Sequence, residues 1–416
     1  MSQIAPSELA KVIRNDLEEE ARVATPHPHW KRLNELGTEL WLDTGDMDEA
    51  NRLWSQEFTA LTTNNTLLNK EIQKGIYDDW IPKAAEAVRA DRPDTSEADL
   101  VLEIAFALNA RHGLRLVEKF GADVSVELHT NLAYDIERSV SYGRRYHAIS
   151  PEHFIVKVPL TAEGLIAARQ LVEDGIRVNF TLGFSARQNV LIACVAQPHY
   201  CNVFMGRLNA YAADEGLGDG AWVGERATLA SQNAVLRLRN DLGIRTRQIG
   251  ASMRTSEQIS SLAGHDIYTM PLGVAEEFLA DPPALDSLSN RVAKNYEPTW
   301  ADTIDSEQEG LEALWTVDES FDRACRELAG WEPGKLSTAA VLEHIEAAGH
   351  RSVLPDLAPE RIQMIREAGK MPQRKAWRDE LANGEVGLDA LFTLAGLHAF
   401  AQDQAALDER ILKQLG

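Results

Sequence analysis

The stretch HFIVKVPLTAEG, residues 153–164, combines a short apolar run with a single lysine, Lys157. Strands of a parallel sheet are buried on both faces, so they consist mainly of β-branched and aromatic residues, as this run does. A buried ammonium group loses its hydration, and desolvation then favours the neutral amine. Lys157 therefore either extends to a surface or is held as a neutral amine for chemistry.

Seven further apolar runs repeat this pattern, with helix-period segments such as TAEGLIAARQLVEDG between them. The runs are ELWLD (39–43), FTALT (58–62), DVSVEL (123–128), IRVNFTL (176–182), YCNVFM (200–205), RQIGAS (247–252) and DIYTM (266–270). Eight strands that alternate with helices predict a parallel sheet, either doubly wound or closed as a barrel. No GxGxxG motif follows the first strand, which argues against a dinucleotide-binding fold. After about residue 280, helical patterns are expected to run to the end of the chain.

The composition bounds the class of protein. The 416 residues are 44% hydrophobic, which allows a sizeable core, and the formal net charge is -22. Such an acidic balance argues against nucleic acid or an anionic membrane as the main partner. The three cysteines form no CxxC pair, as is typical of a reducing compartment, and no run approaches the length of a membrane span. These features predict a soluble cytoplasmic protein.

Polar residues recur at or just after the ends of seven consecutive runs. One such residue would be a satisfied core group or a turn former. Seven strands with the same feature indicate a shared pocket, because the C-terminal ends of the strands of a parallel β/α barrel are where active sites are built. The residues are Asp43, Asn64, Glu127, Lys157, Asn179, Thr181, Asn202, Arg207, Ser252 and Arg254.

These residue types suit one kind of chemistry. A buried lysine amine can form a Schiff base with a carbonyl, and the protonated imine allows a neighbouring C–C bond to break. Glu127 and Asp43 can move the protons, asparagine amides can bind hydroxyls, and two arginines, Arg207 and Arg254, can bind a phosphate. The 11 histidines include no HExxH motif, so no metal site is predicted. A lysine-based aldolase mechanism without a cofactor is the economical interpretation.

Each of these features also has a plainer interpretation. Lys157 and Glu127 could form a structural salt bridge between two strands. The arginines could lie on the surface or pair with the many carboxylates of this acidic chain. The glycine-rich stretch DEGLGDGAW, residues 214–222, lacks the ending of a P-loop and predicts an ordinary loop.

Six motifs, in this order, resemble the transaldolase family: ELWLDTGD, TALTTNNTLL, VSVELHTNLAYD, FIVKVPLTAEGLIAARQLVEDGIRVNFTLGFSARQ, VFMGRLNAY and GASMRT. The resemblance is dense over about residues 39–275, and GLHAFAQDQAALDERI, residues 396–411, resembles the closing helix of that family. It implies a class I aldolase-type (β/α)8 TIM barrel that needs no cofactor. It also implies transfer of a dihydroxyacetone unit from sedoheptulose 7-phosphate or fructose 6-phosphate to an aldose phosphate, in the pentose phosphate pathway.

The resemblance also implies a role for each matching residue. Lys157 matches the Schiff-base lysine, and Asp43 matches the aspartate that takes a proton from the substrate C4 hydroxyl. Glu127 matches the glutamate that handles protons during imine formation through a water shared with Thr181. The dihydroxyacetone hydroxyls are expected at Asn64 and Asn179, and the phosphate at Arg207, Ser252 and Arg254.

Several residues depart from the usual motifs of the family. Asn65 and Val203 stand where prolines are expected, Asn202 replaces a serine of the hydroxyl pocket, and His129 lies near a position that is commonly acidic. The related fructose-6-phosphate aldolases usually carry Gln where Glu127 stands and Tyr where Phe204 stands. Glu127 and Phe204 therefore favour transfer over simple cleavage, with a Schiff-base enzyme for a different phosphorylated sugar as the alternative.

The expected organisation is a single transaldolase-like domain, residues 1–416, whose barrel core spans residues 39–280. Residues 1–38 are expected to add an N-terminal helical extension, residues 290–390 a helical insertion, and residues 391–416 a C-terminal helix that packs on the barrel. The insertion would in the simplest case only bury barrel surface. Because members of the family are often dimers, a homodimer is a further expectation.

Overall fold

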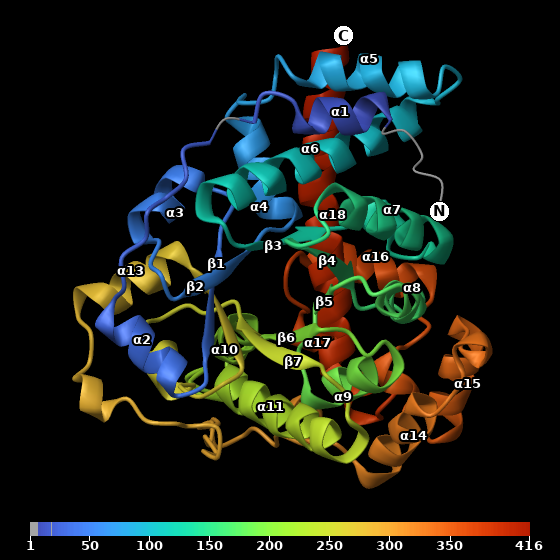
Figure 1. Ribbon diagram of the computed structural model, residues 1–416. Helices are drawn as coiled ribbons and strands as arrows, with labels where there is room; N and C mark the ends of the chain where they lie inside the picture. Colours follow the sequence, from blue (N-terminus) through green and yellow to red (C-terminus); the bar gives the residue numbers. More distant parts are fainter. Residues whose placement is uncertain (1–6, 18) are drawn as a thin grey trace.

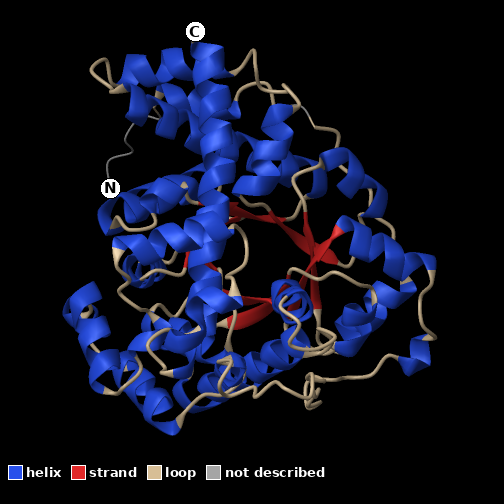
Figure 2. Cartoon of the chain, turned by 180° about the vertical axis from the view of Figure 1, so that it is seen from behind, coloured by secondary structure: helices blue, strands red, loops and turns tan. Residues whose placement is uncertain are grey.

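The computed structural model describes residues 7–17 and 19–416. Its eight parallel strands pair in chain order and close into a barrel, with β1 bonded to β8, and the strand ring is visible in Figure 2. The strands are β1 Glu39–Asp43, β2 Phe58–Thr62, β3 Asp123–Glu127, β4 Phe154–Pro159, β5 Val178–Thr181, β6 Tyr200–Phe204, β7 Arg247–Ala251 and β8 Ile267–Pro271. The structure therefore confirms the predicted (β/α)8 barrel with added helices.

Helices surround this ring on the outside (Figure 1). Up to the last strand they are α1 Glu8–Arg14, α2 Pro28–Glu35, α3 Met47–Leu53, α4 Asn65–Gln73, α5 Ile81–Asp91, α6 Glu97–Phe120, α7 Ile136–Ile149, α8 Ala162–Glu173, α9 Ala186–Val195, α10 Met205–Asp214, α11 Val223–Leu242 and α12 Glu257–Ser261. After it come α13 Leu272–Ala280, α14 Glu319–Ala329, α15 Thr338–Ala347, α16 Pro359–Ala368, α17 Arg374–Ala382 and α18 Leu388–Leu415. None of the helices in the described ranges is long and apolar enough to cross a membrane.

Alternation along each strand separates two cores. In β1, Leu40 and Leu42 face the surrounding helices, whereas Trp41 belongs to a small apolar cluster inside the barrel. The other buried members of that inner cluster are Ala60, Ile155, Ile249, Ala251 and Ile267. Since successive side chains of a strand point to opposite faces, an inward Trp41 makes Asp43 point inward as well. The inner apolar layer thus forms a floor beneath the polar residues at the strand ends.

Capping residues place several helices directly after the strands. The side chains of Asn64, Thr161 and Ser185 accept hydrogen bonds from the first turns of α4, α8 and α9, respectively. Short polar side chains at this position satisfy backbone N–H groups that have no partner within the helix. Each strand therefore turns into its helix within a few residues, which holds the strand-end side chains close to the barrel mouth.

The prediction that helices run from about residue 280 to the end of the chain is only partly confirmed. Residues 281–318 are mostly irregular, with two short 3-10 helices at Leu285–Ser287 and Leu311–Leu314. The adjacent Pro282 and Pro283, and Pro298 further on, remove backbone donors and restrict the residue before each of them, which opposes a continuous helix. Regular helices resume at α14, whose N-cap is Asp318.

The N-terminal segment contains two short helices, α1 and α2, and irregular chain between them. The expectation for residues 1–6 and 18 falls outside the described residues. Helix α1 ends at Arg14, and the guanidinium of Arg111 on α6 donates to the carbonyl oxygens of Val12, Ile13 and Asn15. A cation at a helix C-terminus satisfies its unpaired carbonyl groups, so this contact fixes where α1 stops.

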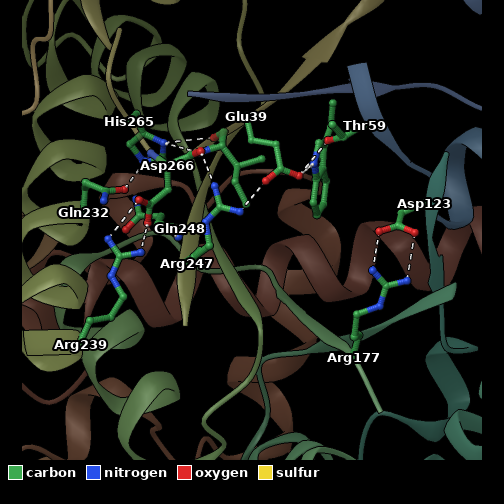
Figure 3. A network of polar contacts seen from close by, with 12 residues as sticks. Glu39, Thr59, Asp123, Arg177, Gln232, Arg239, Arg247, Gln248, His265 and Asp266 are labelled. Carbon is green, nitrogen blue, oxygen red and sulfur yellow. Dashed lines mark hydrogen bonds and ion pairs between the residues drawn. The ribbon is translucent and has the colours of Figure 1, made fainter. Parts of the chain in front are cut away.

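A network of ion pairs closes the opposite end of the barrel, where the strands begin (Figure 3). Arg247 donates to Glu39 at 2.5 Å, and Arg239 donates to both carboxylate oxygens of Asp266 at 2.9 and 3.1 Å. Arg177 likewise pairs with Asp123 at the start of β3. These side chains are far from the strand ends that carry the predicted site, so their role is structural.

Two fully buried histidines make the stability of this fold depend on pH. His112 bonds to the hydroxyl of Tyr77 at 2.9 Å and to the carbonyl of Gly45 at 2.8 Å, and His265 lies next to Asp266. Burial lowers the pKa of both imidazoles from 6.5 to about 4. Below pH 6.5 these imidazoles therefore bind protons in the unfolded chain but not in the folded protein. The free energy of unfolding decreases as the pH is lowered. At about pH 5 the loss is about 2 kcal/mol per histidine.

Urea unfolding at about pH 7.5 and about pH 5 measures this loss. The double variant His112→Gln/His265→Gln is expected to lose less stability between the two pH values than the wild type does. The buried carboxyl groups away from the two histidines act equally in both proteins and cancel in the comparison. Equal losses in the two proteins would contradict the prediction.

Candidate active site

A cleft of about 320 Å³ opens at the C-terminal ends of the strands. Three larger clefts, of about 530, 520 and 410 Å³, lie elsewhere in the described structure; the first two lack these strand-end side chains, and the third contains only Arg254 of them. Nine of the eleven predicted site residues line the smaller cleft: Asp43, Asn64, Lys157, Asn179, Asn202, Phe204, Arg207, Ser252 and Arg254. Glu127 and Thr181 are buried and are not among the side chains that line it.

Lys157 does not extend to the protein surface, since the residue is only 4% exposed. Register places it beside Glu127 on β3 and Asn179 on β5. Its Nζ donates to the carbonyl oxygen of Thr63 at 3.1 Å and lies 3.5 Å from Oε2 of Glu127. The plainer interpretation, a salt bridge between two strands, is thus present in the fold. The same amine also lines the cleft, where a bound carbonyl compound can reach it.

The side chain of Glu127 is buried next to this amine. Burial raises the pKa of the Glu127 carboxyl, and the nearby Lys157 opposes the shift. Oε2 of Glu127 and the hydroxyl of Thr181 are both buried and form no hydrogen bond within the described residues. A raised pKa makes this carboxyl a better proton acceptor than an ordinary carboxylate, which suits acid–base chemistry at an adjacent amine.

Asp43 forms a second acid–base group on the other side of the cleft. Thr62, its register partner on β2, donates to Oδ1 of Asp43 at 2.6 Å, and Thr269 lies 2.6 Å from the Thr62 hydroxyl. Burial raises the pKa of Asp43, while Lys157 opposes the shift. The hydroxyl chain orients the carboxylate, so that its second oxygen can accept a proton from a bound molecule.

The three asparagines differ in what they offer to a ligand. Asn64 uses its amide oxygen to cap α4, accepting from the Leu67 N–H at 2.8 Å, which leaves its NH₂ group for the cleft. Asn179 donates to Ser125 at 3.0 Å, and its amide oxygen is buried without a partner in the described structure. The amide oxygen of Asn202 accepts from the backbone of Gly183 at 3.3 Å. Asn179 is therefore the amide with a free buried acceptor.

Arg207 and Arg254 give one side of the cleft a positive charge. Burial and the neighbouring Arg254 lower the pKa of Arg207 to about 10, and its Nη1 is buried without a hydrogen bond in the described structure. The guanidinium lies 5.4 Å from the centre of the Phe204 ring. A buried cation without a carboxylate partner is suited to bind an anion such as phosphate, because a ligand then supplies the missing charge.

The backbone at this cationic side is tightly built. Ser252 has a left-handed conformation, with φ at 62°, and its carbonyl accepts from the N–H of Gly206 at 3.1 Å. A Cβ atom at Gly206 would lie 2.1 Å from that carbonyl oxygen, so only glycine fits there. Strain of this kind, about 1–3 kcal/mol at a non-glycine residue, persists where the surroundings hold the chain at a functional site.

The cleft also contains residues that sequence reasoning missed. Thr62 had a usable signal, because it is next in sequence to the TNN motif and lies opposite Asp43. Lys70 on α4, Lys370 after α16 and Phe400 on α18 line the cleft as well. The Phe400 ring centre lies 5.8 Å from Nζ of Lys157. No local pattern marks Lys370 or Phe400, because only the path of the C-terminal helices brings them to the barrel mouth.

Together these groups can perform imine chemistry on a small phosphorylated carbonyl compound. The cleft combines an amine, the Asp43 carboxyl with its raised pKa, free amide groups and a positively charged side, and the buried Glu127 carboxyl lies next to the amine. Amine and carboxyl groups at this spacing allow proton transfer during attack on a carbonyl.

Comparison with known proteins shows the family of this chain. The family described as Transaldolase/Fructose-6-phosphate aldolase matches residues 40–329. A transaldolase of Xanthomonas euvesicatoria is 32% identical over 278 residues, which cover 65% of this chain and 84% of the relative. A transaldolase of Trichormus variabilis is 27% identical over 286 residues, 67% of this chain and 82% of the relative. The match begins at the second residue of β1 and includes the seven other strands, and the chain belongs to the transaldolase/fructose-6-phosphate aldolase family.

Proposed function

We propose that this protein is a transaldolase that works through an imine at Lys157. It transfers a dihydroxyacetone unit from a ketose phosphate, sedoheptulose 7-phosphate or fructose 6-phosphate, to an aldose phosphate, as in the pentose phosphate pathway. The observation that carries the proposal is the position of the Lys157 amine in the cleft, 3.5 Å from Glu127.

The first half of the reaction uses the amine and the two carboxyl groups. The Lys157 amine attacks the C2 carbonyl of the ketose, Glu127 transfers the protons, and water leaves as the imine forms. Asp43 then takes the proton of the C4 hydroxyl, and the bond between C3 and C4 breaks. The electron pair of that bond moves into the protonated imine, which becomes an enamine, and the aldose phosphate leaves.

The second half reverses these steps with another aldehyde. The enamine carbon attacks the carbonyl of the acceptor aldose phosphate, and Asp43 returns its proton to the new hydroxyl. Water then hydrolyses the imine and frees Lys157. In this scheme Arg207, Ser252 and Arg254 bind the phosphate group that both sugars carry, while Asn64, Asn179 and Asn202 bind hydroxyls of the three-carbon unit.

Transfer, as opposed to simple cleavage, is supported by Glu127 and Phe204. The fructose-6-phosphate aldolases of the same family usually carry Gln and Tyr at these positions. Phe204 lines the cleft and packs against Phe184, with ring centres 5.6 Å apart, so it offers no hydroxyl to the intermediate. Asn202, in place of the usual serine, favours the alternative that the preferred sugar differs. A panel of phosphorylated ketoses and aldoses separates the two.

Borohydride trapping tests the proposed imine. The protein is incubated with fructose 6-phosphate, reduced with borohydride, and its mass and labelled peptide are determined. We expect a three-carbon adduct on Lys157, because cleavage releases glyceraldehyde 3-phosphate before the reduction. Lys70→Met keeps the label, since it removes another amine of the same cleft, whereas Lys157→Met abolishes it. A folded protein that remains unlabelled with every ketose phosphate of the panel would falsify the proposal.

A further inference from the structure

The segment between α16 and α17 brings a residue of the helical insertion to the cleft. Lys370 lines it, although this residue follows the last barrel strand by about a hundred positions and lies beyond the part of the chain that matches the family. Figure 1 shows α16 and α17 beside the long helix α18. The insertion therefore does more than cover the outside of the barrel.

The fold holds this segment in place. Gly369, just before Lys370, has φ at 82° and ψ at -132°, a conformation that only glycine adopts readily, and it ends α16 with a sharp turn. Directly after Lys370, Met371 packs against the apolar cluster beneath α18, and Pro372 is buried. Arg374 donates to buried Glu309 at 2.6 Å. Lys370 is thus an exposed side chain on an anchored backbone.

The cleft has an excess of positive charge in a strongly acidic protein. Besides Lys157 it is lined by four cationic side chains, Lys70, Arg207, Arg254 and Lys370, whereas Asp43 is the one carboxylate among the lining residues. None of the four forms an ion pair within residues 7–17 and 19–416. With a net charge of -22 there is no shortage of carboxylates to pair with. Cations left without partners around one small cleft attract an anionic ligand.

We propose that Lys370 is a specificity residue that binds the phosphate group of the sugar substrate from the rim of the cleft. The inference rests on the proposed function, and it assigns the insertion a part in substrate recognition. The cleft, of about 320 Å³, is of a size for one sugar phosphate, and Lys370 lines the same cleft as Arg207 and Arg254. An exposed lysine gains little from a surface ion pair but more from a phosphate dianion that neighbouring arginines also bind.

Three variants test the role of Lys370. Lys370→Met is expected to raise the KM for fructose 6-phosphate about tenfold and to leave kcat within about twofold, because the lost contact acts on binding. Lys370→Arg is expected to restore most of the affinity, since it keeps the charge. The matched control is Lys375→Met, which removes an exposed lysine of the same insertion that does not line the cleft. It is expected to change neither constant.

Titration with inorganic phosphate separates this inference from the proposed function. The dissociation constant for phosphate is expected to rise about tenfold in Lys370→Met and to stay unchanged in Lys375→Met. This measurement requires no turnover, so it remains decisive even if the wild type transfers no dihydroxyacetone unit. If Lys370→Met and Lys375→Met unfold at the same temperature, a merely structural effect of the substitution is excluded. An unchanged phosphate affinity in Lys370→Met overturns the inference, whatever the activity of the wild type.

Discussion

The variant Lys157→Met is expected to lose transfer activity by at least about 10⁴-fold, because the nucleophile of the proposed reaction is removed. Methionine is unbranched and of similar length, so it can fill the same space beside the Phe400 ring. Arginine would keep a positive charge but cannot form an imine, and Lys157→Arg is therefore expected to be equally inactive. Steady-state transfer assays with a fructose 6-phosphate donor measure both losses.

The variant Lys157→Met is expected to fold as the wild type does. Removing one member of a buried ion pair leaves an uncompensated charge, but the pKa of Glu127 is already raised by burial, so this carboxyl can take up a proton. Lys375→Met serves as the activity control, because its exposed lysine does not line the cleft. Turnover of Lys157→Met within about tenfold of wild type would contradict the imine mechanism.

The variant Arg187→Met is expected to lower the free energy of unfolding by about 3–5 kcal/mol. Arg187 on α9 donates to both carboxylate oxygens of Asp389 at 2.8 and 2.7 Å, and Ser185 donates to the same carboxylate at 2.6 Å. Asp389 lies in the first turn of α18 and is completely buried. Without the guanidinium, its charge is left in the interior with only the hydroxyl and a backbone N–H as donors.

Urea unfolding of the wild type and of three variants tests this prediction. In Arg187→Met/Asp389→Asn both charges are absent, and much of the lost stability is expected to return. Lys335→Met breaks the exposed pair with Glu332 and is expected to change stability by less than about 1 kcal/mol. A loss in Arg187→Met no larger than in Lys335→Met would show that the buried pair does not anchor α18.

The anchoring of α18 matters for the cleft as well as for stability. This helix carries Phe400, which covers the Lys157 amine, and Asp403, which accepts a hydrogen bond from Thr66 in the first turn of α4. Thr393 on the same helix donates to the carbonyl of Leu182 after β5 at 2.8 Å. The C-terminal helix is therefore bonded to the first turn of α4 and to the loop that follows β5, and it completes the wall of the cleft.

The position of each strand could be predicted from the sequence alone. The apolar run FIVKV is buried at every position and FTALT at every position except Thr59, and β4 and β2 lie where these runs predict them. Their alternation with helices led to a parallel sheet, and the closed barrel then gathers all C-terminal strand ends in one place. Residues as distant in sequence as Asp43 and Arg254 could for this reason be assigned to one site before any coordinates were considered.

What the tertiary structure alone decided is the partner of each side chain and the contribution of the C-terminal helices. The Lys157–Glu127 contact and the use of the Asn64 amide oxygen as a helix cap depend on register and rotamer, which no local pattern encodes. Lys370 and Phe400 reach the cleft only because α16, α17 and α18 pack over the barrel mouth. Strand identity follows from periodicity over a few neighbouring residues, whereas the positions of Lys370 and Phe400 depend on packing between segments hundreds of residues apart, and their geometry exists only once the chain has folded.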